Sequence, residues 1–144
     1  MCTVKVNAQD WTLNSAIGTS YSGINHNITA QRNFNHWHVS VGPSFNYGKN
    51  KLPWSATPGI NVQTGYNLID SGAIQTKAFV SYLLLPIQEA TIQEVNLGYT
   101  MMFRLTPKLQ ATNSVGFGGY GETAEHYSIN GFSYCINFGL SYRL

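Results

Sequence analysis

Apolar and polar residues alternate along most of the chain, in eight segments. The clearest is 132–144, where every even position from Phe132 to Leu144 is apolar or aromatic and every odd position is polar or small. Because successive side chains of a strand point to opposite faces, this alternation predicts strands with one apolar and one polar face. The other segments, in chain order, are 11–21, 24–34, 36–47, 56–68, 73–85, 94–105 and 109–119.

These segments have about the nine to eleven residues that a tilted strand needs to cross a bilayer. No apolar run approaches the roughly 18 residues of a spanning helix, since the longest, 82–85, has four. The sequence therefore predicts an all-β protein, an eight-stranded antiparallel up-and-down transmembrane β-barrel that forms one domain over residues 9–144. Residues 6–8, Val-Asn-Ala, fit the small-residue pattern of a signal-peptidase site. We expect residues 1–8 to be a signal-peptide remnant or leader.

Composition decides which face of the barrel is inside. A soluble barrel would have an apolar interior and would carry charge on its polar faces. Charged residues are only 10% of the chain, against roughly 25% in an average soluble domain. The polar faces consist mainly of Asn, Gln, Ser, Thr and Gly, which can fill a small closed interior and hydrogen-bond within it. The apolar faces are therefore expected to face lipid.

Aromatic residues near the segment ends support a membrane location, because Trp and Tyr concentrate at both interfaces of such barrels. Arg32 lies on an apolar face close to one end, where its head group could reach the lipid headgroups. The set expected on the periplasmic side is Trp11, Phe34, Trp37, Phe103 and Tyr142. The set expected on the outer side is Tyr21, Tyr47, Trp54, Tyr82 and Phe132.

The connections between segments differ in length. Three are very short, at 35–36, 69–72 and 106–107; the others are 22–23, 48–55, 86–93 and 120–131, three of which are longer. Outer-membrane barrels have short periplasmic turns and longer outer loops, which predicts a bacterial outer-membrane protein with both termini in the periplasm. Pro43 and Pro58 each remove a ladder donor from neighbouring segments, where we expect a bulge or strand ends above the hydrocarbon.

The last eight residues resemble the C-terminal signal of bacterial outer-membrane barrels. That signal has a polar residue, Gly two positions later, and aromatics three and five positions after the Gly. Asn137, Gly139, Tyr142 and Leu144 occupy these positions, with Leu144 in place of the usual aromatic. Residues 11–144 as a whole resemble the small OmpA/OmpX-type class of eight-stranded barrels. The resemblance implies contact with outer-membrane lipid and with the barrel-assembly machinery during insertion.

An enzyme alternative comes from the longest connection. His126 and Ser128 are similar to the His-x-Ser motif of outer-membrane lipid A 3-O-deacylases, in which Ser is the nucleophile and His its base. The resemblance implies a catalytic set of His126 and Ser128, with Glu122 or Glu125 in the place of the orienting acid. The sequence departs from that family, because Ile129 replaces the Asn after the Ser and the last strand carries no Glu. An ordinary polar loop is the simpler interpretation, and loss of acyl release in Ser128→Ala would distinguish the two.

Four charged residues project into the predicted interior: Lys77, Glu94, Arg104 and Arg143. One interpretation is a charge-paired, hydrogen-bonded plug and the other is a narrow pore. Eight strands leave little lumen and buried charges need partners, which favours the plug. Lys77 is then the nearest counter-ion expected for Glu94.

Other site types have weaker support. His36 and His38 share a face and could begin a metal site, but no third ligand is evident, so no metal or cofactor is predicted. Cys2 and Cys135 have no metal or redox spacing, and a disulfide between them would join the chain ends. The net charge of +2 offers no basic stripe for nucleic acid.

The leading prediction is a non-enzymatic integral outer-membrane barrel with a structural, assembly-partner or surface-binding role. Its loops are short for an adhesin, which favours a partner within the membrane, such as another outer-membrane protein. A lipid A hydrolase and a narrow pore are the alternatives.

Overall fold

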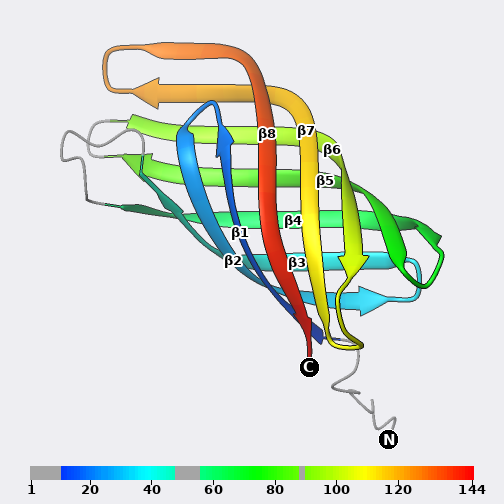
Figure 1. Cartoon of the computed structure of the whole chain (residues 1–144). Coiled ribbons are helices and arrows are strands. Elements are labelled where there is room, and N and C mark those ends of the chain that lie inside the picture. Colours follow the sequence, from blue (N-terminus) through cyan, green and yellow to red (C-terminus); the bar gives the residue numbers. More distant parts are fainter. Residues whose placement is uncertain (1–10, 48–55, 88–89) are drawn as a thin grey trace, which may run out of the picture.

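The computed structural model describes residues 11–47, 56–87 and 90–144, which form a closed barrel of eight antiparallel strands (Figure 1). Each strand pairs with the next in the chain, and β8 closes the barrel against β1 with Thr12 opposite Arg143. No helix in the described ranges is long and apolar enough to cross a membrane. The strands are β1 Trp11–Ser20, β2 Gly23–Phe34, β3 Trp37–Asn46, β4 Thr57–Asp70, β5 Ile74–Ile87, β6 Ala90–Arg104, β7 Leu109–Ala124 and β8 Ser128–Arg143.

The barrel has two ends. At the terminal end β1 begins and β8 finishes, and the backbone N–H of Leu144 donates to the carbonyl of Trp11 at 3.1 Å. The β2–β3, β4–β5 and β6–β7 connections lie there too, and the β1–β2 and β7–β8 turns lie at the opposite loop end (Figure 1). The predicted barrel is confirmed, because the last strand pairs with β7 on one edge and with β1 on the other.

Two predicted loops are wrong. The sequence predicts connections over 86–93 and 120–131, but β6 already begins at Ala90, and β7 and β8 continue to Ala124 and from Ser128. The β7–β8 hairpin therefore extends well past the β1–β2 turn (Figure 1). Alternation failed as a signal here because Gly118, Gly119 and Gly121 have no side chains to alternate, whereas backbone pairing continues as far as Thr123 opposite Ser128.

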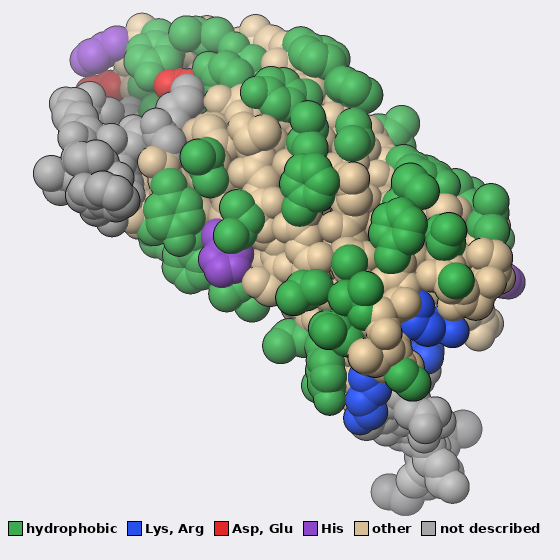
Figure 2. All heavy atoms as spheres, viewed as in Figure 1, with side chains coloured by type: hydrophobic (Ala, Val, Ile, Leu, Met, Phe, Trp, Pro, Cys, Tyr) green, Lys and Arg blue, Asp and Glu red, His purple; other side chains and the backbone are tan. Residues whose placement is uncertain are grey.

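The predicted distribution of polarity is confirmed. Polar side chains such as Ser44, Ser133 and Ser141 are buried inside the barrel, and outward-facing Leu97, Phe132 and Phe138 are at least 60% exposed. Among the described residues 34 large apolar side chains are exposed, whereas only six apolar residues are buried. Figure 2 shows apolar side chains along the visible wall, with Lys and Arg gathered near the terminal end.

The middle of the interior is filled by Phe79, which is 3% exposed. Its ring lies over the two neighbouring strands. A β-carbon added at Gly98, which pairs with Phe79 in the β5–β6 ladder, would lie 2.6 Å from the Phe79 Cζ, and one added at Gly116 on β7 would lie 3.2 Å from it. Those glycines are therefore required for the close approach of the ring. Toward the loop end a small apolar cluster of Leu83, Leu85 and Ile92 adds to this packing.

The prolines cause less distortion than predicted. The β2–β3 ladder lacks the pairings opposite Gly42 and Pro43, but Asn27–Ser44 and Ala30–Val41 on either side keep the same register. Pro58 pairs opposite Phe45 near the start of β4. The bulge expected near the prolines occurs elsewhere, between β4 and β5 at Asn67 and Ile69.

Candidate functional site

The loop end of the interior is closed around Glu94, which is fully buried in β6. Its Oε1 accepts hydrogen bonds from the Ser20 hydroxyl and the Ser22 backbone N–H, both at 3.0 Å, and its Oε2 accepts one from the Ser133 hydroxyl at 2.8 Å. A carboxylate that accepts several hydrogen bonds can remain buried without a cation. The predicted pairing of Glu94 with Lys77 is absent from the structure, and small donors from β1, its turn and β8 take its place.

A second layer covers this acid. Asn25 donates from its side-chain amide to the Ser20 hydroxyl at 2.9 Å and to the Ser22 hydroxyl at 3.3 Å, and Asn46 donates to the Asn25 side-chain oxygen at 2.8 Å. These residues come from β1, β2, β3 and the β1–β2 turn, so the network ties several strands together across the mouth. The plug predicted from the interior charges is thus built mainly from neutral side chains.

The rim above this network is aromatic. The Tyr21 ring stacks on Tyr120 with centroids 3.3 Å apart, and Glu122 accepts hydrogen bonds from the hydroxyls of Tyr21 at 3.3 Å and Tyr127 at 2.8 Å. The pKa of the Tyr21 phenol is raised above its usual value by the hydrogen bond with Tyr120, by burial and by the Glu122 charge. Tyr21 therefore lies over the barrel mouth rather than on the outer wall, where the sequence placed it.

The predicted hydrolase residues lie at the β7–β8 turn. Ser128 begins β8, and Glu125 and His126 belong to the turn itself. The structure shows no hydrogen bond between His126 and Ser128, and the carboxylate of Glu122 contacts tyrosine hydroxyls. The four residues are close along the hairpin, but they do not form the linked nucleophile, base and acid that the chemistry needs.

The terminal end of the interior is open and positively charged. A vestibule of about 170 Å³ is lined by Lys77, Arg104, Lys108 and Arg143 and by one acid, Asp70. Amide side chains from β2, β4, β5 and β7 complete its wall. The sequence placed three of these cations inside the barrel, and the structure brings them together at one mouth.

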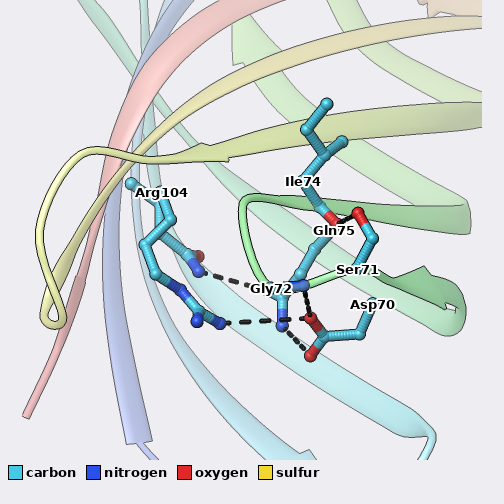
Figure 3. Close-up of polar contacts among 7 residues, drawn as sticks. Asp70, Ser71, Gly72, Ile74, Gln75 and Arg104 are labelled. Carbon is cyan, nitrogen blue, oxygen red and sulfur yellow. Dashed lines mark hydrogen bonds and ion pairs between the residues drawn. The ribbon is translucent and has the colours of Figure 1, made fainter.

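The Asp70 carboxylate is hydrogen-bonded to residues at the β4–β5 turn (Figure 3). It accepts hydrogen bonds from the Gln75 amide at 2.6 Å and the Gly72 backbone N–H at 3.1 Å, and it lies 4.0 Å from Arg104. The donation from Gln75, followed by that from Gly72, lowers the pKa of Asp70 below its usual value. Gly72 has a φ of 79°, which a residue without a β-carbon adopts at little cost.

Lys77 and His38 lie deeper, around a central cavity of about 100 Å³. Lys77 is 6% exposed and His38 is 1% exposed. Neither ring nitrogen of His38 has a hydrogen-bond partner in the described part of the chain. His36, by contrast, packs against the outward-facing Tyr66 ring at 5.7 Å, so the two imidazoles occupy different surroundings. Within 11–47, 56–87 and 90–144 no cluster of His, Cys, Asp or Glu could hold a metal ion.

The outer wall carries two features of its own. Near the terminal end the Arg32 guanidinium lies over the rings of Trp11 at 5.7 Å and Phe34 at 4.9 Å, the place where a cation was expected among interfacial aromatics. Nearer the loop end Ser15 Oγ and His26 Nε2 are 3.0 Å apart, a contact that alternation alone could not reveal. The described residues provide no third group that orients His26, so this pair lacks the acid of a catalytic triad.

The residues of the C-terminal signal lie along β8. Asn137 and Gly139 line the interior side, where a β-carbon at Gly139 would meet the Ser15 carbonyl oxygen and Ala16. Tyr142 and Leu144 are 45% and 52% exposed on the outer face, and the Lys108 ammonium lies 5.8 Å from the Tyr142 ring. Cys135 is a buried free thiol. Cys2, Trp54 and the leader expected at 1–8 fall outside the described residues.

The barrel resembles solved structures of transmembrane barrels. A designed transmembrane β-barrel matches with a TM-score of 0.65 and 10% identity over 98% of this chain and 100% of that chain. The N-terminal β-barrel domain of Pseudomonas aeruginosa OprF matches with a TM-score of 0.63 and 8% identity, over 93% of this chain and 97% of that chain. Neisserial surface protein A matches with a TM-score of 0.54 and 11% identity, over 93% of this chain and 94% of that chain.

No protein-family model matches the chain, and its sequence has no significant match among curated proteins. The likeness is therefore one of fold. The chain has the closed eight-stranded fold of small outer-membrane barrels of the OmpA/OmpX type.

Proposed function

We propose that the chain is an integral outer-membrane protein that does not conduct and acts through its lipid-facing wall and its loop-end hairpin. The observation that carries this proposal is the reversed polarity of the barrel. Its interior is lined by hydrogen-bonded polar side chains, whereas the outer wall exposes side chains such as Leu97 and Phe138 at 60% or more. A soluble monomer rarely exposes an apolar patch larger than a few hundred Å². A surrounding lipid bilayer would shield this apolar wall from water.

The proposed compartment is the bacterial outer membrane, with both termini on the periplasmic side. A closed barrel satisfies every ladder without a free edge, which is what a membrane-spanning sheet requires. Of the barrels reported above, Neisserial surface protein A is by its name a surface protein. The C-terminal residues Asn137, Gly139, Tyr142 and Leu144 support entry through the barrel-assembly machinery. The β7–β8 hairpin extends from the opposite end of the barrel (Figure 1), which supports a periplasmic location of the terminal end.

The proposed role is structural, assembly-linked or surface-binding rather than conducting or catalytic. The Glu94 network closes the loop end with direct hydrogen bonds, which supports a silent lumen. The β7–β8 hairpin and the outer wall remain as the contact surfaces, and the wall suits a partner that is itself in the membrane. Planar-bilayer recordings are expected to show no discrete conductance for the purified barrel, and steady openings would contradict this part of the proposal.

The membrane assignment is tested by two matched substitutions on one strand. Leu97 and Leu105 are similarly exposed, at 65% and 57%, but Leu97 lies at the middle of β6 and Leu105 just beyond its terminal end. A cation on the lipid face costs about 2–4 kcal/mol at the bilayer midplane and about 0–1 kcal/mol near the interface. Leu97→Arg is therefore expected to reduce folding into lipid vesicles strongly, and Leu105→Arg to have little effect.

The readout is the fraction of barrel that migrates in its compact, unheated form on a denaturing gel. Equal behaviour of the two variants would refute a bilayer around this wall. In cells, the wild-type chain is expected to fractionate with the outer membrane and to resist urea extraction.

Orientation is tested with single cysteines in a Cys2→Ser background, because Cys135 is buried. Tyr127→Cys lies at the loop end and Lys108→Cys at the terminal end. A membrane-impermeant maleimide should label the first in intact cells and the second only after the outer membrane is permeabilised. The reverse order would overturn the periplasmic placement of the termini.

A further inference from the structure

The vestibule at the terminal end has a strong imbalance of charge. Four cationic side chains line it, Lys77, Arg104, Lys108 and Arg143, against the single carboxylate of Asp70. That carboxylate accepts hydrogen bonds from Gln75 and the Gly72 backbone N–H at the β4–β5 turn, and it lies 4.0 Å from Arg104 at the end of β6. Among the described residues, neither Lys77 nor Lys108 forms an ion pair with this carboxylate.

Lys77 is the residue on which the inference depends. It is 6% exposed and has no hydrogen bond or ion pair with any described residue. It lines both the vestibule and the central cavity, three residues or about 10 Å along β5 from the terminal end. Its like charge interacts unfavourably with that of Arg143. A buried ammonium in this position is costly unless an anion or water compensates it.

We propose that the vestibule binds a small oxyanion of the phosphate type, with Lys77 at its floor and the Arg104 and Arg143 guanidiniums on its walls. A guanidinium presents a planar fork of donors that matches a phosphate or carboxylate edge, and an ammonium adds a point charge. A volume of about 170 Å³ is roughly tenfold what one water needs. Several converging cations favour a doubly charged phosphate over a singly charged carboxylate.

The site depends on the barrel fold alone, so its failure would leave the proposed membrane location untouched. The test uses the full chain refolded in an uncharged maltoside detergent, with inorganic phosphate as the probe. Isothermal titration is expected to show saturable binding, and phosphate should raise the thermal unfolding midpoint more than sodium chloride of equal ionic strength. An equal effect of both salts would mean general screening and would overturn the proposal.

Substitutions then locate the site. Lys77→Met keeps the length of the side chain without its charge and should weaken phosphate binding by about tenfold or more. Lys77→Arg should retain it within about threefold. The matched control is Arg32→Gln, which removes one cation from the outer wall and should leave phosphate affinity unchanged. Unaltered affinity in Lys77→Met, or an equal loss in Arg32→Gln, would overturn the assignment.

Stability without phosphate provides an independent check. Because Lys77 has no described partner, Lys77→Met should leave the unfolding midpoint unchanged or raise it. A marked loss of stability would mean that Lys77 has a partner within the chain, and the proposal would fail.

The same chemistry could come from free phosphate or from a lipid headgroup. Titration with inorganic phosphate in micelles tests the first source, and titration with vesicles containing phosphatidic acid tests the second. Competition of inorganic phosphate against the lipid shows which one the vestibule takes. Saturable, Lys77-dependent binding of either supports an oxyanion site, and binding of neither refutes it.

Discussion

The loop end and the terminal end of the interior accommodate buried charge in opposite ways. At the loop end Glu94 accepts hydrogen bonds from two serine hydroxyls and a backbone N–H. At the terminal end Lys77 is almost as deeply buried and has no described partner. The difference lies in where the partners are placed. Two hydroxyls and a backbone N–H are aimed at the Glu94 carboxylate, whereas no acceptor of the described residues lies within hydrogen-bond distance of the Lys77 ammonium.

The boundary between the two ends is the Phe79 ring, and its removal is the largest change we predict. Phe79 packs against the space left by Gly98 and Gly116, so Phe79→Ala leaves a cavity that glycines cannot fill. A buried Phe→Ala change costs about 3–5 kcal/mol, to be measured by denaturant-induced unfolding in micelles. Phe117→Ala, on the outer face and 58% exposed, is the control and should cost much less.

The same variant also tests which part of the interior blocks conduction. Because the Glu94 network closes the loop end independently of Phe79, Phe79→Ala should remain silent in planar bilayers despite its larger cavity. Conductance in Phe79→Ala would show that the aromatic ring, and not the Glu94 network, is the barrier.

Removing the buried acid itself should have the next largest effect. Glu94→Ala leaves the hydroxyls of Ser20 and Ser133 and the N–H of Ser22 without their acceptor, at an expected cost of about 3 kcal/mol in unfolding free energy. Glu94→Gln keeps one oxygen acceptor and should lose about a third of that. Equal stabilities of the two variants would mean that a neutral acceptor retains nothing, so that these hydrogen bonds depend wholly on the carboxylate charge.

Two serines of β8 allow a finer comparison of the hydrogen bonds at the two ends. Ser133 donates to the Glu94 carboxylate at 2.8 Å, and Ser141 donates to the neutral Asn14 side-chain oxygen at 2.6 Å. Hydrogen bonds to charged groups contribute about 1.5–3 kcal/mol and neutral ones about 1 kcal/mol. Ser133→Ala should therefore destabilise the barrel about twice as much as Ser141→Ala in the same unfolding assay. The reverse order would refute a special role for the loop-end acid.

The sequence predicts the fold well because the barrel imposes a period of two wherever one wall meets lipid. Segments such as 132–144 and 94–105 show the alternation fully, and the matching strands are confirmed. Alternation does not predict the structure at the glycine-rich end of β7, where no side chains distinguish the two faces. It also does not predict the position of Tyr21, which lies in a turn and not on the barrel wall.

The site was less predictable. Alternation places Lys77, Glu94, Arg104 and Arg143 on the interior side, but it does not give their positions around the barrel. Closure sets those positions, because Glu94 meets Ser20 and Ser133 only once β1 and β8 pair. Lys77, which the sequence predicts as the counter-ion of Glu94, was therefore the wrong partner. Three small donors, each unremarkable in sequence, took its place.

The smallest effect is expected at the terminal-end turn, where Asp70 is exposed and its interactions are screened by water. Its pKa is lowered in the folded state, chiefly by the Gln75 amide and then by the Gly72 N–H. A lowered folded-state pKa means that the contribution of Asp70 is present above its unfolded pKa of 3.8 and is lost as the pH falls through the lower folded value. Asp70→Asn should therefore reduce stability at neutral pH by less than about 1 kcal/mol.

The pH dependence makes this small loss testable. Unfolding midpoints of wild type and Asp70→Asn should differ at pH 7 and converge as the pH falls below 3.8. Asp70→Asn also leaves Arg104 without its carboxylate, so phosphate should bind the variant more tightly if the vestibule is an oxyanion site. A difference in stability that persists undiminished in acid would show that the side chain acts through its shape. In that case, the pH dependence of stability would not come from the carboxylate of Asp70.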